Sequence, residues 1–504
     1  MSQAPVRSII IAGGGTAGWM AATLLSRRLA PLGIAITLIE STTIGTVGVG
    51  EATTPAIRDF FAEAGLNEAE VMRSSNATAK LGILFDGWAG SNNRFFHPFG
   101  LYGTPSNGVD FHHYWAKLRA NGDITPLDRY SLASQLALNG RMMTPLRPAP
   151  DYAFFDWAVH FDAALFSRHL RGVAEARGVV RIDARIEQVE RSDETGRILS
   201  LQTDTGARIA GDLFIDCTGF RALLAGDALK EPYEDWRALL PVDRAVAIPC
   251  AYRETGAAID PYTRVTARPA GWQWRIPLRD RIGNGYVYAS SHVSDDEAAA
   301  TLRATIEGEA LAEPNLLRFT TGRRQRAWVS NCVALGLAAG FLEPLESTSI
   351  TLIYSGLQRL LALFPGESMD PALSDEYNRI TQLEYERVRD FLILHYWANR
   401  RSEPFWAERR MTALPDALAH KVRLFEARGR MVRMEWETFA DPSWLAILVG
   451  LGIVPQVWDP LADGFTARQI ESAFGRMTRD VTKLATAAPK HRAWLETMFG
   501  EVIG

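Results

Sequence analysis

Three glycines near the start of the sequence have the spacing that lets a backbone approach a phosphate group. Gly13, Gly15 and Gly18 form a G-x-G-x-x-G pattern in "IAGGGTAGWM", and Glu40 follows 22 residues after Gly18. Glycines allow close approach to a pyrophosphate, and the start of the next helix supplies N–H donors. An acid at about this distance can bind a ribose hydroxyl. The pattern therefore predicts a dinucleotide site.

Two tryptophans stand two positions apart in "GWQWRIPL", residues 271–278. Residues two apart in a strand point to the same face, so the indoles of Trp272 and Trp274 would stand side by side. That arrangement can be core packing or the wall of a binding site. The spacing alone favours core packing.

Ionisable residues within apolar sequence are the other candidates for chemistry. Lys80 lies in "NATAKLGILF", and burial there would lower the pKa of its amine. Its residue type alone favours a solvated charge on a helix. Glu343 and Glu346 lie in "EPLEST", where either could be a general base and one could be a structural cap.

The elements that would position these residues begin with residues 7–40. This stretch is typical of a buried strand, the glycine turn, an amphipathic helix and a second strand that ends at Glu40. Residues 178–220 are rich in strands and end with Asp216, Thr218 and Gly219. The order suits a large FAD-binding fold in which distant segments wrap one cofactor. No second complete G-x-G-x-x-G unit is present for NAD(P)H, so the flavin is expected to be reduced elsewhere.

The last third of the chain changes character. From about residue 370 the pattern is helical with charged outer faces, and residues 440–455 form an apolar segment bounded by prolines. We therefore expect an FAD-binding body at 1–369 with inserted substrate-facing segments. We expect a mainly helical part at 370–504 that packs on this body, lines the substrate pocket and does not fold independently.

Composition narrows the class of protein. The chain has 504 residues, 47% of them hydrophobic, and a net charge of −4, which gives no reason to expect nucleic acid or membrane as a partner. Its three cysteines, Cys217, Cys250 and Cys332, are too few and too dispersed for a disulfide framework or a metal cluster, so no metal is expected. The start of the sequence lacks a signal-peptide pattern, and no window of 18 apolar residues occurs. A cytoplasmic protein is the simplest expectation.

The sequence resembles the flavin-dependent tryptophan halogenases over nearly its whole length. The resemblance lies in separated motifs: "AGGGTAGWMAA" at 12–22, "GVGEATTP" at 48–55, "HFDA" at 160–163, "FIDCTG" at 214–219, "GWQWRIP" at 271–277 and "FLEPLESTSI" at 341–350. The motif G-W-x-W-x-I-P is the family's own signature and is more specific than the glycine turn. The expected fold is therefore α/β, an FAD-binding Rossmann-like flavin monooxygenase fold with a mainly helical C-terminal part.

The resemblance implies a path for the flavin along the chain. The implied cofactor residues are Thr16 and Ala17 in the glycine turn, Val49 and Ala52 in the strap at 42–52, Ile186 near the adenine end, and Leu337 and Ile350 against the isoalloxazine.

The resemblance also implies the chemistry. Trp272 and Trp274 would keep the organic substrate off the flavin, so that halide is oxidised in its place. The hypohalous acid then reaches Lys80 through the protein. Of the two acids, the resemblance selects Glu346, which would hold the electrophilic halogen or accept the proton lost from the arene.

Thr348 and Ser349 match the family's halide position, which uses mainly backbone N–H groups. Family members usually have glycine at the second position. Ser349 still offers its N–H, so halide binding should survive if the backbone there does not need a positive φ.

The substrate residues match less well. His97 and Phe99 match the aromatic residues that sandwich an indole ring. Relatives have adjacent tyrosines that help to hold the amino-acid end of tryptophan, whereas this chain has Trp444 and Leu445. A second lysine of some relatives is Leu84 here. We therefore expect a substrate that lacks the zwitterionic tail or holds it otherwise, such as indole or an indole derivative, and Trp444 to contact it.

The expected function is that of an FADH₂-dependent halogenase, which uses O₂ and chloride or bromide to halogenate an electron-rich arene. Its expected partners are a separate NAD(P)H-dependent flavin reductase and a small aromatic substrate. Many relatives resemble dimers, although no residue argues for a homodimer on physical grounds. The alternatives are an aromatic monooxygenase that hydroxylates its substrate, a free-tryptophan halogenase, and a non-catalytic flavin or aromatic-metabolite binding protein.

Overall fold

The computed structural model describes residues 6–43, 50–90, 93–254, 256–365 and 369–501. The chain divides into two compact units, each made of three segments. Unit 1 contains Met1–Ala77, Phe161–Asp243 and Arg318–Glu386, and unit 2 contains Thr78–His160, Arg244–Leu317 and Arg387–Gly504. The segments of the two units alternate along the sequence. The expectation that residues 370–504 line a substrate pocket stays a prediction.

Unit 1 is built on a six-stranded sheet. Its order is β20 (Trp328–Val329), β21 (Cys332–Ala334), β12 (Leu213–Asp216), β1 (Ser8–Ala12), β2 (Ala35–Glu40) and β8 (Val180–Asp183). All neighbouring pairs are parallel except β20 and β21. The isoleucines at 9–11 are at most 2% exposed, as expected for a parallel strand covered on both faces.

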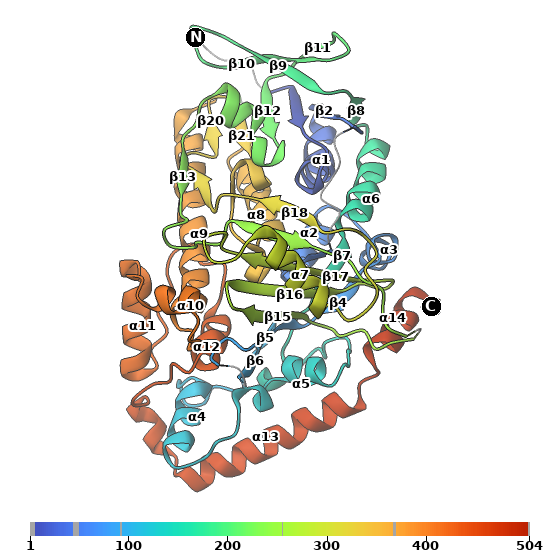
Figure 1. Ribbon diagram of the computed structural model, residues 1–504. Helices are drawn as coiled ribbons and strands as arrows, with labels where there is room; N and C mark the ends of the chain where they lie inside the picture. The colour runs from blue at the N-terminus through green and yellow to red at the C-terminus, as the bar shows by residue number, and fades with distance from the viewer. Residues whose placement is uncertain (1–5, 44–49, 91–92, 255, 366–368, 502–504) are drawn as a thin grey trace. The chain divides into compact units, whose positions relative to one another are not determined.

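The predicted strand, turn, helix and strand at the N-terminus are confirmed. α1 (Thr16–Leu29) follows β1, and β2 ends at Glu40. Figure 1 shows α1 beside α6 (Ala163–Ala176), with which it packs. This Rossmann-like arrangement confirms the expected α/β fold class.

Unit 1 also contains two small sheets. One contains β9 (Ile186–Arg191), β10 (Ile198–Thr203) and β11 (Arg208–Ala210), and the other contains β13 (Tyr233–Asp235), β19 (Gly322–Arg324) and β22 (Gly340–Phe341). The unit also contains β3 (Gly50–Ala52), α2 (Ala56–Glu63), α3 (Glu68–Ser74) and α8 (Ser349–Ala362). The predicted strand-rich character of residues 178–220 is thus confirmed.

Unit 2 contains a seven-stranded sheet. Its order is β18 (Asn315–Arg318), β14 (Arg244–Ala247), β17 (Ile282–Tyr288), β16 (Gly271–Pro277), β15 (Thr263–Arg268), β5 (Gly82–Asp86) and β6 (Arg94–Pro98). The tryptophan motif forms β16, and all seven of its residues are buried. β4 (Thr78–Lys80) pairs antiparallel with β7 (Ala158–Asp162) through Thr78–His160 and Lys80–Ala158.

Helices provide most of the rest of unit 2. They are α4 (Phe111–Ala120), α5 (Leu132–Leu138), α7 (Asp295–Thr305), α10 (Pro404–Arg410), α11 (Asp416–Arg428), α12 (Asp441–Gly450), α13 (Ala467–Ala487) and α14 (His491–Phe499). α13, the long orange-red helix in Figure 1, packs against α4 and α5. With α9 (Pro371–Trp397), the helices α10 to α14 confirm the predicted helical C-terminal third. Within the described ranges, no helix has the length and apolar character needed to cross a bilayer.

Candidate active site

The glycine turn of unit 1 leaves the start of α1 open. Gly13 has a φ of +101°, and a Cβ there would lie 2.3 Å from the carbonyl oxygen of Cys217. Gly15 is the N-cap of α1, and no heavy atom lies within 4 Å of where its Cβ would stand. The N-cap makes no side-chain hydrogen bond. An open, uncapped helix start fits the pyrophosphate of a dinucleotide.

Glu40 lies at the end of β2, where its carboxylate is already oriented. Arg181 Nε donates to Oε1 at 2.5 Å, and Trp19 Nε1 donates to Oε2 at 3.3 Å. The carboxylate is partly exposed, with 16% of the side chain accessible. These bonds fix the acid close to the glycine turn, since a Cβ on Gly14 would overlap its carboxylate. The contact with a ribose stays a prediction.

The other predicted flavin residues all belong to unit 1. Thr16, Ala17 and Gly18 open α1, Ala52 ends β3, Ile186 begins β9, Leu337 lies in the turn Gly336–Ala338, and Ile350 lies in α8; Val49 is outside the described residues. The hydroxyls of Thr54 and Thr351 lie 2.7 Å apart and join the segment after β3 to α8. Unit 1 therefore gathers segments far apart in sequence on the glycine-turn fold, which suits a cofactor wrapped by distant segments.

The predicted halide residues form the N-terminus of α8. Thr348 is the N-cap, and Ser349 is the first helical residue, so the backbone of Ser349 is helical and needs no positive φ. The residue with a positive φ is Ser347, at +60°. Thr348 makes no side-chain cap, and its buried Oγ1 has no hydrogen-bond partner among the described residues. Uncapped N–H groups at a helix start attract an anion.

Both candidate acids are buried beside this helix start. Glu343 is 0% exposed and Glu346 is 1% exposed, and Glu346 ends the short turn Pro344–Glu346 that leads to Thr348. Burial thus does not distinguish the two acids. The choice of Glu346 stays a prediction.

Lys80, in unit 2, is not a solvated helix charge. It is the last residue of the strand β4 and is 0% exposed. Its Nζ lies 5.0 Å from the centroid of the Phe99 ring, within the range of a cation–π contact. The structure therefore holds this amine in a desolvated aromatic setting, which the residue type alone did not predict.

A hydrogen-bonded network fixes the strand that carries Lys80. Thr78 Oγ1 donates to the carbonyl oxygen of Pro277 at 2.7 Å and lies 3.0 Å from His160 Nδ1, which therefore donates to it. His160 Nε2 lies 2.9 Å from Thr263 Oγ1, which donates to it. Burial holds the pKa of His160 well below its usual value, so the imidazole is neutral. The sequence showed the motif around His160 but not this network.

The two tryptophans of β16 lie side by side, as their spacing predicts. Their ring centroids are 6.2 Å apart with planes at 57°. Trp272 Nε1 donates to Tyr396 Oη at 3.0 Å. Trp274 Nε1 has no hydrogen-bond partner within the described part of the chain. Their position between flavin and substrate stays a prediction.

Ring contacts run through unit 2 from Lys80 to Trp444. Phe99 lies edge-to-face with His97 at 6.3 Å and 71°. His97 contacts Phe391 at 6.1 Å, and Phe391 contacts Trp444 at 4.8 Å. The rings of His97 and Phe99 are far from parallel, so a sandwiched arene would require one of them to rotate. The sandwich stays a prediction.

Two charged residues beside Trp444 were not singled out from the sequence. Lys421, on α11, is 2% exposed, and its Nζ lies 2.5 Å from Glu437 Oε1 and 4.0 Å from the centroid of the Trp444 ring. Burial lowers the pKa of Lys421, and the bond to Glu437 opposes this. The expectation that the charges of α11 face outward is wrong for this residue.

Asp216, in the "FIDCTG" motif, has a structural role that the sequence did not specify. Its fully buried carboxylate accepts hydrogen bonds from the backbone N–H groups of Thr218, Leu224 and Ala225 and from the Thr218 hydroxyl. These bonds fold the chain after β12 back on itself. The acid therefore shapes the turn beside Gly13.

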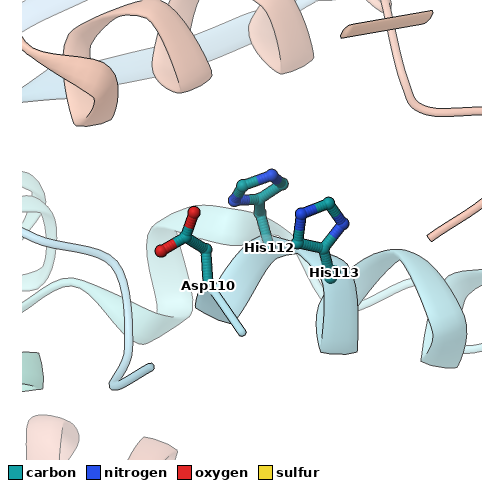
Figure 2. A group of neighbouring side chains, drawn as sticks. All are labelled: Asp110, His112 and His113. Atoms are coloured by element: carbon teal, nitrogen blue, oxygen red, sulfur yellow. The ribbon is translucent and has the colours of Figure 1, made fainter. Parts of the chain in front are cut away.

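One group in the described part of the chain has the composition of a metal site. Figure 2 shows Asp110, His112 and His113, whose potential ligand atoms lie within 4.8 Å of one another. His112 Nε2 donates to the carbonyl oxygen of Gly429 at 2.7 Å, and His113 Nδ1 accepts from the N–H of Asp459 at 3.2 Å. Both imidazoles thus bond to backbone, and burial lowers the pKa of His113 to about 4. We interpret the group as a polar junction between α4 and two neighbouring segments.

Comparison with known proteins identifies the family. The family model for tryptophan halogenase matches residues 8–467. Tryptophan 6-halogenase SttH of Streptomyces toxytricini is 37% identical in an alignment of 473 residues, with 88% of this chain and 89% of that protein covered. Tryptophan 7-halogenase RebH of Lentzea aerocolonigenes is 34% identical over 532 residues, with 98% and 99% covered.

Solved structures agree with this result. BrvH, a flavin-dependent halogenase from Brevundimonas sp. BAL3, superimposes with a TM-score of 0.95 at 47% identity, covering 98% of this chain and 99% of that chain. The chain therefore belongs to the tryptophan halogenase family and is an enzyme of the flavin-dependent halogenase class.

Proposed function

We propose that this enzyme halogenates a neutral, electron-rich arene, indole or an indole derivative, with chloride or bromide (X⁻). The overall reaction is ArH + X⁻ + H⁺ + O₂ + FADH₂ → ArX + FAD + 2 H₂O. The observation that carries the proposal is Lys80, a fully buried amine against the Phe99 ring at the start of a series of aromatic contacts.

Unit 1 supplies the cofactor and halide positions in this proposal. The glycine turn and the residues Ala52, Ile186, Leu337 and Ile350 would hold the flavin, and the N–H groups of Thr348 and Ser349 would hold the halide. Bound reduced flavin supplies, with O₂, the oxidising power that converts halide to hypohalous acid. The reduced flavin would come from a separate reductase, because the sequence has one dinucleotide fingerprint.

Lys80 and Glu346 would carry the transfer of halogen. The Lys80 amine hydrogen-bonds the hypohalous acid, or forms an N–X bond with loss of water, and presents X⁺ to the arene. A buried amine is suited to this because desolvation favours its free-base form. Glu346 would accept the proton that leaves the arene carbon, which is general-base work for a buried carboxylate.

The test is a product assay with the full chain. It contains FAD, NADH, a flavin reductase, catalase and bromide, with indole, tryptophan and simple phenols as substrates and mass spectrometry as the readout. Lys80→Met removes the amine and keeps the apolar stem, and Lys483→Ala at an exposed lysine of α13 is the control. We expect a bromine isotope doublet on indole for the parent and the control, and a loss of about 100-fold or more in Lys80→Met.

Three outcomes of the product assay would contradict the proposed function, and each points to a different explanation. Bromination that persists in Lys80→Met would assign the chemistry to free hypobromite. An exclusively hydroxylated product would identify a monooxygenase. Turnover of tryptophan in preference to indole would reassign the substrate.

A further inference from the structure

The ion pair Lys421–Glu437 is buried against Trp444 in unit 2. The two charged side chains are 3% and 2% exposed, and the Lys421 ammonium lies 4.0 Å from the centroid of the indole. An ammonium over an indole face is held by the ring's quadrupole. The pair thus fixes the plane of Trp444 while neutralising its own charge.

Two polar atoms of this cluster have no hydrogen-bond partner among the described residues. They are Oε2 of Glu437, an acceptor, and Nε1 of Trp444, a donor. Buried polar atoms nearly always have a partner, and a missing one calls for an explanation. Both atoms belong to side chains that contact the same ammonium, so one ligand with a donor and an acceptor could satisfy both.

The cluster terminates the series of ring contacts that begins at Lys80. Trp444 contacts Phe391, which contacts His97, and His97 in turn contacts Phe99 next to Lys80. A flat aromatic ring packs favourably against side chains of this kind. The two polar atoms without a partner therefore lie at the far end of a buried aromatic cluster that starts at the amine.

The charges of Lys421 and Glu437 are directed at each other. Asp441 and Arg387, which act on Lys421 electrostatically, have opposite signs. A charged amino-acid tail buried here would have to compete with Lys421 or Glu437 for its partner, and leaving a buried charge unpaired is strongly unfavourable. A neutral N–H or O–H group has no such penalty.

We propose that Lys421, Glu437 and Trp444 form a specificity-determining subsite that selects a neutral arene with an N–H or O–H donor over one with an ionised tail. Glu437 Oε2 accepts the ligand's donor, and Trp444 Nε1 donates to an acceptor where the ligand has one. This inference rests on the proposed function for calling the ligand a substrate.

The experiment shifts the charge of the subsite in both directions. Glu437→Gln leaves the Lys421 ammonium unpaired, and Lys421→Met leaves the Glu437 carboxylate unpaired. The probes are indole, anionic indole-3-acetate and cationic tryptamine, and their Kd values are measured by equilibrium dialysis without flavin. Glu313→Gln, at an exposed glutamate paired with Arg303, is the matched control, and circular dichroism verifies folding.

We expect the parent and the control to bind indole more tightly than either ionic probe. Glu437→Gln should raise the affinity for indole-3-acetate relative to that for indole by about tenfold or more. Lys421→Met should raise the relative affinity for tryptamine to the same extent. The ratio of two Kd values measured on one preparation does not depend on the fraction of the protein that is folded. If one variant fails to fold, the other still tests the proposal, as does Lys421→Arg, which should retain the parent ratios.

Unchanged Kd ratios in the folded charge variants would overturn the proposal, as would a parent that binds indole-3-acetate or tryptamine more tightly than indole. Because binding is measured without turnover, failure of the proposed function has a different signature. In that case the ratios shift as expected while no arene is halogenated in the product assay.

Discussion

Trp274 has room on β16 because its cross-strand neighbour is a glycine. Gly285 on β17 pairs with Trp274, and a Cβ at Gly285 would lie 2.0 Å from the indole ring. The indole thus covers the backbone of the next strand. The spacing of the tryptophans predicted that they share a face, but the residue opposite them follows from the register of two strands, which the motif does not contain.

We predict that Gly285→Ala displaces Trp274. Overpacking of this kind costs about 1–3 kcal/mol of unfolding free energy, and the displaced indole should also lower halogenation. Urea denaturation and the product assay measure the two effects. Gly172→Ala in α6 is the control, because its Cβ would meet nothing within 4 Å and alanine favours a helix interior. Equal stability of the two variants would contradict the prediction.

The sequence contained a signal for Lys421 that the charge pattern obscured. Leu418, Val422 and Phe425 are buried at helical spacing, and Lys421 lies three residues after the first and four before the last. A lysine on an apolar stripe is expected to need a buried partner. That partner, Glu437, follows 16 residues later and is found only in the folded chain.

At the scale of elements, the short strand β4 is joined to its neighbours by side chains. Thr78 bonds to Pro277 at the end of β16 and to His160 on β7, and His160 bonds to Thr263 at the start of β15. Thr78 and Lys80 are two apart in one strand and share a face. The network therefore fixes the strand from which the amine of Lys80 projects.

Thr78→Val should weaken this network. It leaves the Pro277 carbonyl and the His160 N–H without a partner, which costs about 1–3 kcal/mol of unfolding free energy. Halogenation should fall while flavin affinity, which the proposed function assigns to unit 1, is retained. Thr78→Ser, which restores the hydroxyl, should recover both quantities. Denaturation, flavin titration and product assays on both variants measure these quantities. An equal loss of stability and of halogenation in Thr78→Val and Thr78→Ser would contradict the role of the network.

His491 on α14 makes stability depend on pH. Its Nδ1 donates to the carbonyl oxygen of Ile259, and its Nε2 accepts from the N–H of Ala79. Burial lowers its pKa to about 4, below the ordinary value of 6.5, so only the unfolded chain takes up this proton between those pH values. The contribution of His491 to the free energy of unfolding is therefore fully present above pH 6.5 and is lost as the pH falls towards 4.

The loss from His491 amounts to at most about 3 kcal/mol. Urea denaturation at several pH values measures it, and His491→Gln should flatten the curve between pH 6.5 and 4. Neutral, buried His160 adds a dependence of the same sign. A parent protein with constant stability over this range would contradict the assignment.

Periodicity predicted the elements with strong local signals. The strand, turn, helix and strand at residues 8–40 and the helices of the last third follow from patterns within each segment. The position of Lys80 did not, because β4 has three residues and is formed by pairing with β7, which is distant in sequence. Short strands depend on their partners more than on propensity.

At the scale of the whole molecule, the two units are interleaved along the chain. In unit 2, Val481 and Ala485 of α13 share a hydrophobic cluster with Leu81 and Phe96, about 400 residues earlier. A cluster assembled from such distant segments cannot form from either one alone. The glycine fingerprint and the family motifs predicted a large α/β enzyme, but these pairings depend on tertiary contacts that no local pattern encodes.

We expect the fragment 1–369 not to fold cooperatively. It lacks the segment Arg387–Gly504, so the part of unit 2 that it retains would expose apolar residues normally covered by α13. Circular dichroism and thermal denaturation of the fragment, beside the full chain, test this. A sharp melting transition in the fragment with native-like ellipticity would contradict it.

The three cysteines have a practical consequence. Cys217, Cys250 and Cys332 are free thiols, and all are buried. Burial holds the pKa of Cys217 and Cys332 well above the usual value, which suppresses the reactive thiolate. A maleimide probe should therefore react slowly with the native protein and rapidly with a cysteine introduced at an exposed position. Pairs of such positions, one in each unit, would carry spin labels or fluorophores without removal of any native thiol.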